Sequence, residues 1–265
     1  MNGSKKRKML ILALSLILLF CSGMYAYQVY QQHMSSKIYE EAQKLASVEP
    51  TPSPEPTSEP EPTPEPEPVE TVNPYLELFT EIDLPALKEV NQGVIGWILI
   101  PDTPISYPLM YSGENVYYLS HTWDKKYNAA GSIFLEQYNA PDLSDFNTII
   151  YGHRMNNGSM FGSLKRYKEP DYWSEHPYVY IYNEAGAFRY EIFAAYEASV
   201  TGDTYRLGLT ETEDRQSFLD ACLGWSVLET GIVPTVDDQI ITLSTCTGTG
   251  YDSRWVVQAK YTPEE

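Results

Sequence analysis

A run of twenty-two residues without a charged side chain, MLILALSLILLFCSGMYAYQVY at 9–30, limits what the N-terminal part of this chain can form. At about 1.5 Å of rise per residue, a helix of this length spans a hydrocarbon layer of about 30 Å. The run follows the basic segment KKRK. Because basic residues mark the cytoplasmic side of a membrane helix, the pattern predicts a cytoplasmic segment at 1–8, a single-pass signal-anchor in the cell membrane at 9–30 and an extracellular remainder.

Two other interpretations of this segment stay open. A cleaved signal peptide would have a shorter apolar run that ends in small residues. A lipoprotein-type cysteine at Cys21 would follow a small side chain, whereas the bulky Phe20 precedes it. The uncharged length therefore favours an uncleaved anchor.

A second segment, EPTPSPEPTSEPEPTPEPEPVE at 49–70, cannot form a hydrophobic core. Nine of the chain's nineteen prolines lie between 50 and 68, and glutamates alternate with them. Charge repulsion and the fixed φ of proline predict an extended linker at 49–72, which could hold a domain about 60 Å from the bilayer. Residues 31–48 would then be a membrane-proximal stalk, and the folded domain would occupy 73–265.

The composition narrows the choice of partners and cofactors. A formal net charge of −18 argues against nucleic acid, because such a partner requires a basic surface. Three cysteines are too few for a disulfide framework, and no CxxC pair or cluster of histidine and cysteine has the spacing of a zinc site. We therefore expect neither a metal nor a cofactor.

Short strands dominate the pattern of the domain. Apolar residues at helical spacing, interrupted by Pro85, predict two short helices within 73–93, and a further helix is expected over 211–229. Turn residues separate eight apolar runs that we interpret as strands, at 94–100, 105–111, 131–136, 147–153, 178–183, 188–199, 239–245 and 254–261. Eight short strands with few helices predict a mainly β fold, a closed or nearly closed β-barrel.

Cys246 lies at the end of the seventh expected strand, directly before a glycine-containing loop. If the run RWVVQAKY forms an antiparallel neighbour, Arg254 begins that strand and lies beside Cys246. A nearby cation favours the thiolate, which is the nucleophilic form of cysteine. Cys222 instead lies on the apolar face of the helix expected over 211–229, as a buried small side chain would.

A thiol nucleophile needs a proton partner, which is commonly a histidine. His153 is the best candidate, because it ends the strand-like run NTIIYGH. His33 and His176 are expected to be solvated, the first in the stalk and the second in a turn, and His121 lies in a polar loop. His153 and Cys246 are far apart in the chain, so only the fold can bring them together.

These motifs resemble those of the sortase family of Gram-positive surface transpeptidases, whose signature is TLxTC with an arginine that opens the next strand. The chain reads TLSTC at 242–246, followed by Arg254, and YGH at 151–153 lies upstream. The segments 115–136 and 147–167, together with the expected helices, resemble class B most. The resemblance covers about 75–265, and the predicted anchor and linker agree with it.

The resemblance implies an eight-stranded sortase-type β-barrel with N-terminal helices and a helix before the last strand pair. It implies that Cys246 attacks the carbonyl of a threonine in the C-terminal sorting motif of a surface protein, which leaves a thioester acyl-enzyme. His153 would act as general acid and then base, and Arg254 would hold the substrate backbone or the oxyanion. The acceptor would be an amine of a peptidoglycan precursor or of a pilin.

Residue-by-residue matching to the family also assigns the wall of the substrate pocket. The residues implied are Ser244, Thr245, Asn115, Leu119 and Tyr151. The loop TGTGYDS at 247–253 departs from the family pattern, because Thr247 stands where many relatives carry an acidic residue. Substrate contacts in that loop are therefore not carried over.

Two other classes of function stay open from the sequence. One is a non-enzymatic, tethered β-barrel binding module in which Cys246 is a structural residue. The other is a secreted cysteine peptidase or a wall-modifying cysteine transpeptidase of another family. The chain shows no LPxTG-like signal followed by an apolar tail, so we expect it to be the enzyme and not its substrate.

Overall fold

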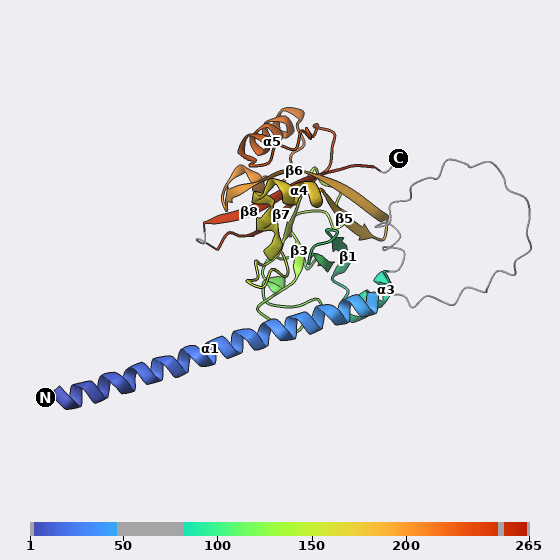
Figure 1. Ribbon diagram of the computed structural model, residues 1–265. Helices are drawn as coiled ribbons and strands as arrows, with labels where there is room; N and C mark the ends of the chain where they lie inside the picture. Colours follow the sequence, from blue (N-terminus) through green and yellow to red (C-terminus); the bar gives the residue numbers. More distant parts are fainter. Residues whose placement is uncertain (1–2, 47–81, 249–251, 264–265) are drawn as a thin grey trace, which may run out of the picture.

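A long helix, α1 (Gly3–Ala46), precedes the barrel in the computed structural model, which describes residues 3–46, 82–248 and 252–263. The C-terminal part of α1 lies along the barrel, and its N-terminal part extends well beyond it (Figure 1). By length and composition, α1 is the one helix among the described residues that could cross a membrane.

Eight strands form the barrel, and this confirms the predicted fold class. The strands are β1 (Val94–Leu99), β2 (Ser106–Met110), β3 (Ile133–Leu135), β4 (Asn147–Tyr151), β5 (Tyr178–Asn183), β6 (Gly186–Ser199), β7 (Ile240–Cys246) and β8 (Ser253–Tyr261). They close in the order β1-β2-β3-β4-β7-β8-β6-β5. The pairs β2–β3 and β4–β7 are parallel, and the other pairs are antiparallel.

The connections between strands carry short helices. These are η1 (Tyr117–Leu119), η2 (Gly162–Lys168), α4 (Pro170–Glu175), η3 (Asp203–Tyr205) and α5 (Thr212–Trp225). The last of these confirms the helix expected over 211–229, although α5 ends before Ser226. Its place directly before the final strand pair is the one that the sequence pattern predicts.

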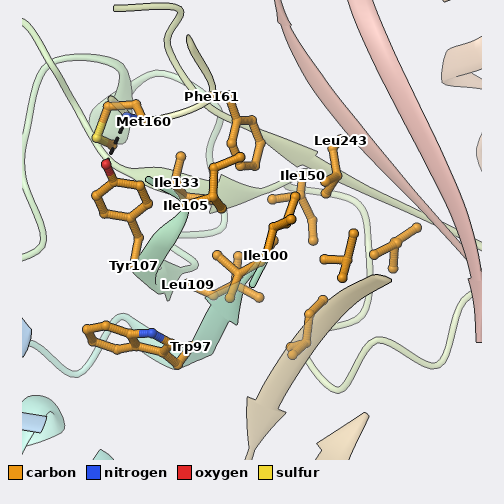
Figure 2. Packing of buried hydrophobic residues seen from close by; sticks show 14 of the residues in the cluster. Trp97, Ile100, Ile105, Tyr107, Leu109, Ile133, Ile150, Met160, Phe161 and Leu243 are labelled. Carbon is orange, nitrogen blue, oxygen red and sulfur yellow. Dashed lines mark hydrogen bonds between the residues drawn. The ribbon is translucent and has the colours of Figure 1, made fainter. Parts of the chain in front are cut away.

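The barrel interior is filled by branched and aromatic side chains, several of which Figure 2 shows together. Ile100, Ile133 and Ile150 are fully buried there. Burial of each such side chain contributes about 1.5–3 kcal/mol. The hydroxyl of Tyr107 reaches across to the loop after β4, where it accepts a hydrogen bond of 3.0 Å from the backbone N–H of Met160 (Figure 2). This bond joins the loop that carries His153 to the interior.

A second apolar cluster lies between α5 and the strands β6, β7 and β8. Phe218, Leu219 and Cys222 of α5 are buried in it, at helical spacing. The prediction that Cys222 is a core residue is therefore confirmed. In Figure 1 this helix covers the side of the barrel away from α1.

Only one of the two short helices expected within 73–93 falls among the described residues. It is α3 (Leu84–Val90). Asp83 caps its N-terminus, because the Asp83 carboxylate accepts a hydrogen bond from the backbone N–H of Ala86. Pro85 lies in its first turn, where a missing N–H costs nothing. Residues 73–81 and the linker expected at 49–72 lie outside the described residues.

Residues 31–46, within the segment expected as a stalk at 31–48, continue α1 and pack against the barrel. Trp123 Nε1 donates a hydrogen bond of 3.0 Å to the carbonyl of Ile38, and the Tyr39 hydroxyl donates to the carbonyl of Gly131. The backbone N–H of Asp83 donates a hydrogen bond of 2.8 Å to the carbonyl of Ala46. The end of α1 therefore contacts the residue that precedes α3, although the linker separates the two in the sequence. The buried residues of this part of α1 lie on one face of the helix, and polar residues lie between them in the sequence, so composition alone does not reveal them. They are Ser35, Ile38, Tyr39, Ala42 and Ala46.

Candidate active site

The parallel pairing of β4 with β7 explains how two distant residues reach the same barrel edge. Tyr151 is the register partner of Ser244, and the N–H of Gly152 donates to the Ser244 carbonyl at 3.2 Å. Because parallel strands run in the same direction, their C-terminal ends meet at one edge. His153 therefore leaves β4 where Cys246 ends β7.

Arg254 lies directly across from Cys246 in the antiparallel pair β7–β8. This register confirms that the thiol-bearing and guanidinium-bearing residues are lateral neighbours. The Nη1 of Arg254 donates a hydrogen bond of 2.9 Å to the carbonyl of Ser253, which orients the guanidinium at the start of β8. Cys246 is partly exposed, as a thiol that meets a substrate must be.

A cavity of about 200 Å³ opens at this edge. All eight site residues expected from the sequence lie in its wall, and Phe134 and Gly152 complete it. The eight are Cys246, His153, Arg254, Ser244, Thr245, Asn115, Leu119 and Tyr151. The fold thus gathers a thiol, an imidazole and a guanidinium around one small space.

The imidazole of His153 is oriented by the chain that precedes β3. Its Nε2 lies 2.7 Å from the carbonyl oxygen of Leu119. Because a carbonyl oxygen only accepts, Nε2 carries a proton and donates it in this bond. The contact gives Leu119 a role through its backbone, since it selects the tautomer and holds the ring at the cavity.

Glu136 is a site residue that sequence reasoning missed. It is 5% exposed, and its Oε2 accepts hydrogen bonds from Asn115 Nδ2 at 2.6 Å and from the Tyr151 hydroxyl at 2.9 Å. Burial, followed by the charge of Glu136, raises the pKa of Tyr151, so this phenol stays protonated. The sequence feature that could have identified Glu136 is its position as a charged residue at the end of the apolar run GSIFLE.

Two further side chains of β7 line the cavity, and they differ in their hydrogen bonding. The Ser244 hydroxyl lies 2.8 Å from the hydroxyl of Tyr205. The Thr245 Oγ1 is buried and has no hydrogen-bond partner among the residues that the structure describes. An unsatisfied buried hydroxyl beside an open cavity is available to a bound molecule.

The other histidines lie away from this cavity. The expectation that His176 is solvated is wrong, because it is 9% exposed and its Nδ1 donates to the carbonyl of Pro101 at 3.0 Å. It lies at the end of α4, where a short helix turns into β5 and the ring packs against Tyr172. His121 stacks on Tyr117, and His33 is exposed on α1.

The described residues hold no group of three or more histidine, cysteine, aspartate or glutamate side chains that could bind a metal ion. The lining of the cavity offers the chemistry of a thiol, an imidazole and a guanidinium. Such a set can carry out acyl transfer, in which a thiolate takes the acyl group and an imidazole moves the proton.

Comparison with known protein families agrees with this geometry. The Sortase domain model matches residues 98–262, which is more than half of the chain. The chain belongs to the sortase family. It is therefore a cysteine transpeptidase, and the relatives that it matches are class B sortases.

Among curated proteins, sortase B of Listeria monocytogenes is 39% identical over 182 residues, which cover 67% of this chain and 73% of that sortase. The crystal structure of Staphylococcus aureus sortase B is 30% identical, with a TM-score of 0.65, and covers 68% of this chain and 87% of its own. A sortase B from Bacillus anthracis in complex with AAEK1 is 29% identical, with a TM-score of 0.71, and covers 89% of this chain and 100% of its own. These sortases are thus similar to this chain in fold and, at 29–39% identity, in sequence.

Proposed function

We propose that this sortase cleaves a C-terminal sorting motif after a threonine and joins the resulting acyl group to an amine of the cell wall or of a pilin. One observation carries the proposal. Cys246 ends β7 directly across from Arg254, in a cavity whose wall also contains His153. The thiol, the imidazole and the guanidinium supply the nucleophile, the proton carrier and the charge stabiliser that such a reaction needs.

In the first half of the reaction, the Cys246 thiolate attacks the threonine carbonyl carbon and forms a tetrahedral oxyanion. Collapse of this intermediate breaks the peptide bond and leaves a thioester on Cys246. The imidazolium of His153 protonates the departing amine, and the Leu119 carbonyl keeps the ring in place while it does so. An acceptor amine then attacks the thioester and gives up its proton to His153; the new amide bond forms as the C–S bond breaks, which releases the Cys246 thiolate.

Arg254 stabilises the oxyanion or holds the substrate backbone, because the planar guanidinium presents several donors in a fixed arrangement. The unpartnered hydroxyl of Thr245 is a second donor for the substrate. Asn115 and Tyr151 are held by Glu136 and line the cavity beside β7. Ser244 of β7 also lines the cavity, and Tyr205 orients its hydroxyl.

An amine acceptor is supported by one structural relative. A sortase B complexed with Gly3 is 30% identical to this chain, with a TM-score of 0.65, and covers 68% of this chain and 86% of its own. The free amine of such a short peptide is the group that attacks a thioester in the second half-reaction. We propose the same class of acceptor for this chain.

The placement of the enzyme follows from its N-terminal part. We propose that residues 1–8 are cytoplasmic, that 9–30 cross the membrane as part of α1, and that the barrel is extracellular. Support comes from the apolar composition of this helix and from the basic residues that precede it. The packing of 31–46 on the barrel then makes α1 itself the connection between the membrane and the catalytic domain.

Product analysis tests the proposed reaction. The full chain is incubated with a peptide library that carries candidate sorting motifs, with and without triglycine, and the products are identified by mass spectrometry. We expect a new amide between the threonine carboxyl and triglycine. Release of free acid alone, with the amine present, would identify a peptidase instead.

A further inference from the structure

A groove of about 620 Å³ lies between α1 and the loop that follows His153. The apolar wall comes from α1 and includes Phe20, Met24 and Tyr25. The opposite wall comes from the barrel and includes Arg154 and Asn156. Its volume is in the range of sites that bind small molecules.

Arg154 lines this groove, and no group among the described residues pairs with its guanidinium. Within residues 3–46, 82–248 and 252–263, its guanidinium has no hydrogen bond, ion pair or aromatic contact, and its Nε is buried. A buried unsatisfied donor costs about 1–3 kcal/mol, so such groups are normally paired. The chain has 36 acidic residues against 18 basic ones, yet no described carboxylate pairs with this cation. The arrangement is that of an anion site.

The absence of a side chain at Gly248 leaves room for the Arg154 guanidinium near Cys246. A Cβ at that position would collide with the Arg154 guanidinium, and Gly248 also has a φ of +83°, which favours glycine. Gly248 lies two residues after Cys246, and Arg154 directly follows His153. The cation therefore lies between the candidate active site and the groove along α1.

The groove runs along α1 from Phe20, midway through the apolar run, to Gln32, just beyond its outer end. Tyr25, Tyr27 and Tyr30 form an exposed aromatic group there, which is typical of the membrane–water interface. Docking on the barrel begins one residue later, where Asn128 Nδ2 donates to the carbonyl of Gln31 at 3.3 Å. Lipid phosphates occupy this depth, and arginine side chains extend towards them.

We infer that this groove binds a membrane phospholipid, with an acyl chain along Phe20 and Met24 and the phosphate at Arg154. The inference rests on the membrane placement of α1 proposed above. The apolar wall favours a phospholipid over free phosphate, and the unpartnered guanidinium favours an anionic head group over a neutral one. A bound lipid would hold the loop that begins at His153 against the bilayer surface.

Native mass spectrometry of the full chain in detergent tests this inference with three probes, phosphatidylglycerol, diacylglycerol and inorganic phosphate. We expect the wild-type protein to retain phosphatidylglycerol, and Arg154→Gln to retain at least fivefold less. Arg166→Gln is the matched control, because this exposed side chain lies on η2 beside Glu169 and outside the groove. Ala129→Trp, which fills the groove from the barrel side, should reduce retention to the same extent.

Three results would overturn the inference. Equal retention of phosphatidylglycerol by Arg154→Gln and by the wild type would show that Arg154 does not bind the phosphate. Retention of diacylglycerol as strong as that of phosphatidylglycerol would show that the site does not recognise a phosphate at all. Displacement of phosphatidylglycerol by inorganic phosphate at equal concentration would make the site one for free phosphate. Vesicle flotation of the same proteins tests the membrane placement separately, since Arg154→Gln should float as the wild type does.

Discussion

The two cysteines of the barrel lie in regions that differ in almost every physical respect. Cys246 is partly exposed at the end of β7, opposite Arg254 and in the wall of an open cavity. Cys222 is fully buried on α5, where the Tyr196 hydroxyl lies 3.3 Å from its sulfur. Burial raises the pKa of the Cys222 thiol to about 11, so this cysteine stays neutral.

This difference shows that the position in the fold, and not the residue type, decides which thiol can react. The β7 edge exposes polar groups that await a ligand, such as the Thr245 hydroxyl. The α5 side pairs its polar groups with each other, since Tyr196 also contacts Gln258, which donates to Thr242. The first region is accessible to solvent and substrate, and the second is closed by side-chain packing.

The largest expected effect comes from the loss of the Cys246 thiol. Cys246→Ala should abolish the covalent adduct between enzyme and substrate, because no other described thiol lines the cavity. Cys222→Ala should form the adduct as the wild type does. Mass spectrometry of the intact protein after incubation with substrate separates the two. A persistent adduct in Cys246→Ala would assign the nucleophile elsewhere.

Next in size is the loss of the imidazole. His153→Ala should lower kcat/KM by about 10³-fold across the accessible pH range, since positioned proton transfer contributes about 10²–10⁴-fold. His121→Ala is the matched control, because His121 stacks on Tyr117 and lies outside the cavity wall. A His153→Ala enzyme with a substantial share of wild-type turnover would contradict the acid–base role.

Arg254→Lys should have a smaller effect, a fall in turnover of about 10²-fold, because lysine keeps the charge but loses the planar arrangement of donors. Steady-state kinetics with a cognate peptide measures this. Arg206→Lys provides the comparison, since Arg206 pairs with Asp214 outside the cavity. Near-normal kinetics in Arg254→Lys would mean that charge alone suffices beside Cys246.

The smallest effect concerns the packed cysteine. Cys222→Ala should lower the free energy of unfolding by about 1 kcal/mol at pH 7 and leave kcat/KM within about twofold. The folded state raises the pKa of Cys222, so its neutral thiol stabilises the fold below the ordinary pKa, and this contribution is lost as pH rises towards 11.

The stability difference between wild type and Cys222→Ala should therefore narrow between about pH 9 and 11, as measured by denaturant unfolding. A constant difference over that range would place Cys222 in a solvated environment. A loss of catalysis in a folded Cys222→Ala protein would break the comparison between the two regions altogether.

Much of the site could be predicted from local sequence patterns. Strand alternation and turn residues are local properties, so they located eight strands and placed Cys246 and Arg254 at facing ends of one antiparallel pair. The position of His153 at a strand end could be predicted in the same way, because a polar residue at the end of an apolar run marks a strand terminus. The mainly β class and the buried position of Cys222 followed from the same periodicities.

The tertiary structure decided what depends on contacts between distant segments. Parallel pairing of β4 with β7 brings His153 to Cys246, and no local pattern specifies which strands become neighbours. The burial of Glu136 and of His176 depends on partners far away in the chain. The docking of α1 was hidden for the same reason, because its buried stripe has meaning only against the barrel surface that Trp123 and Gly131 supply.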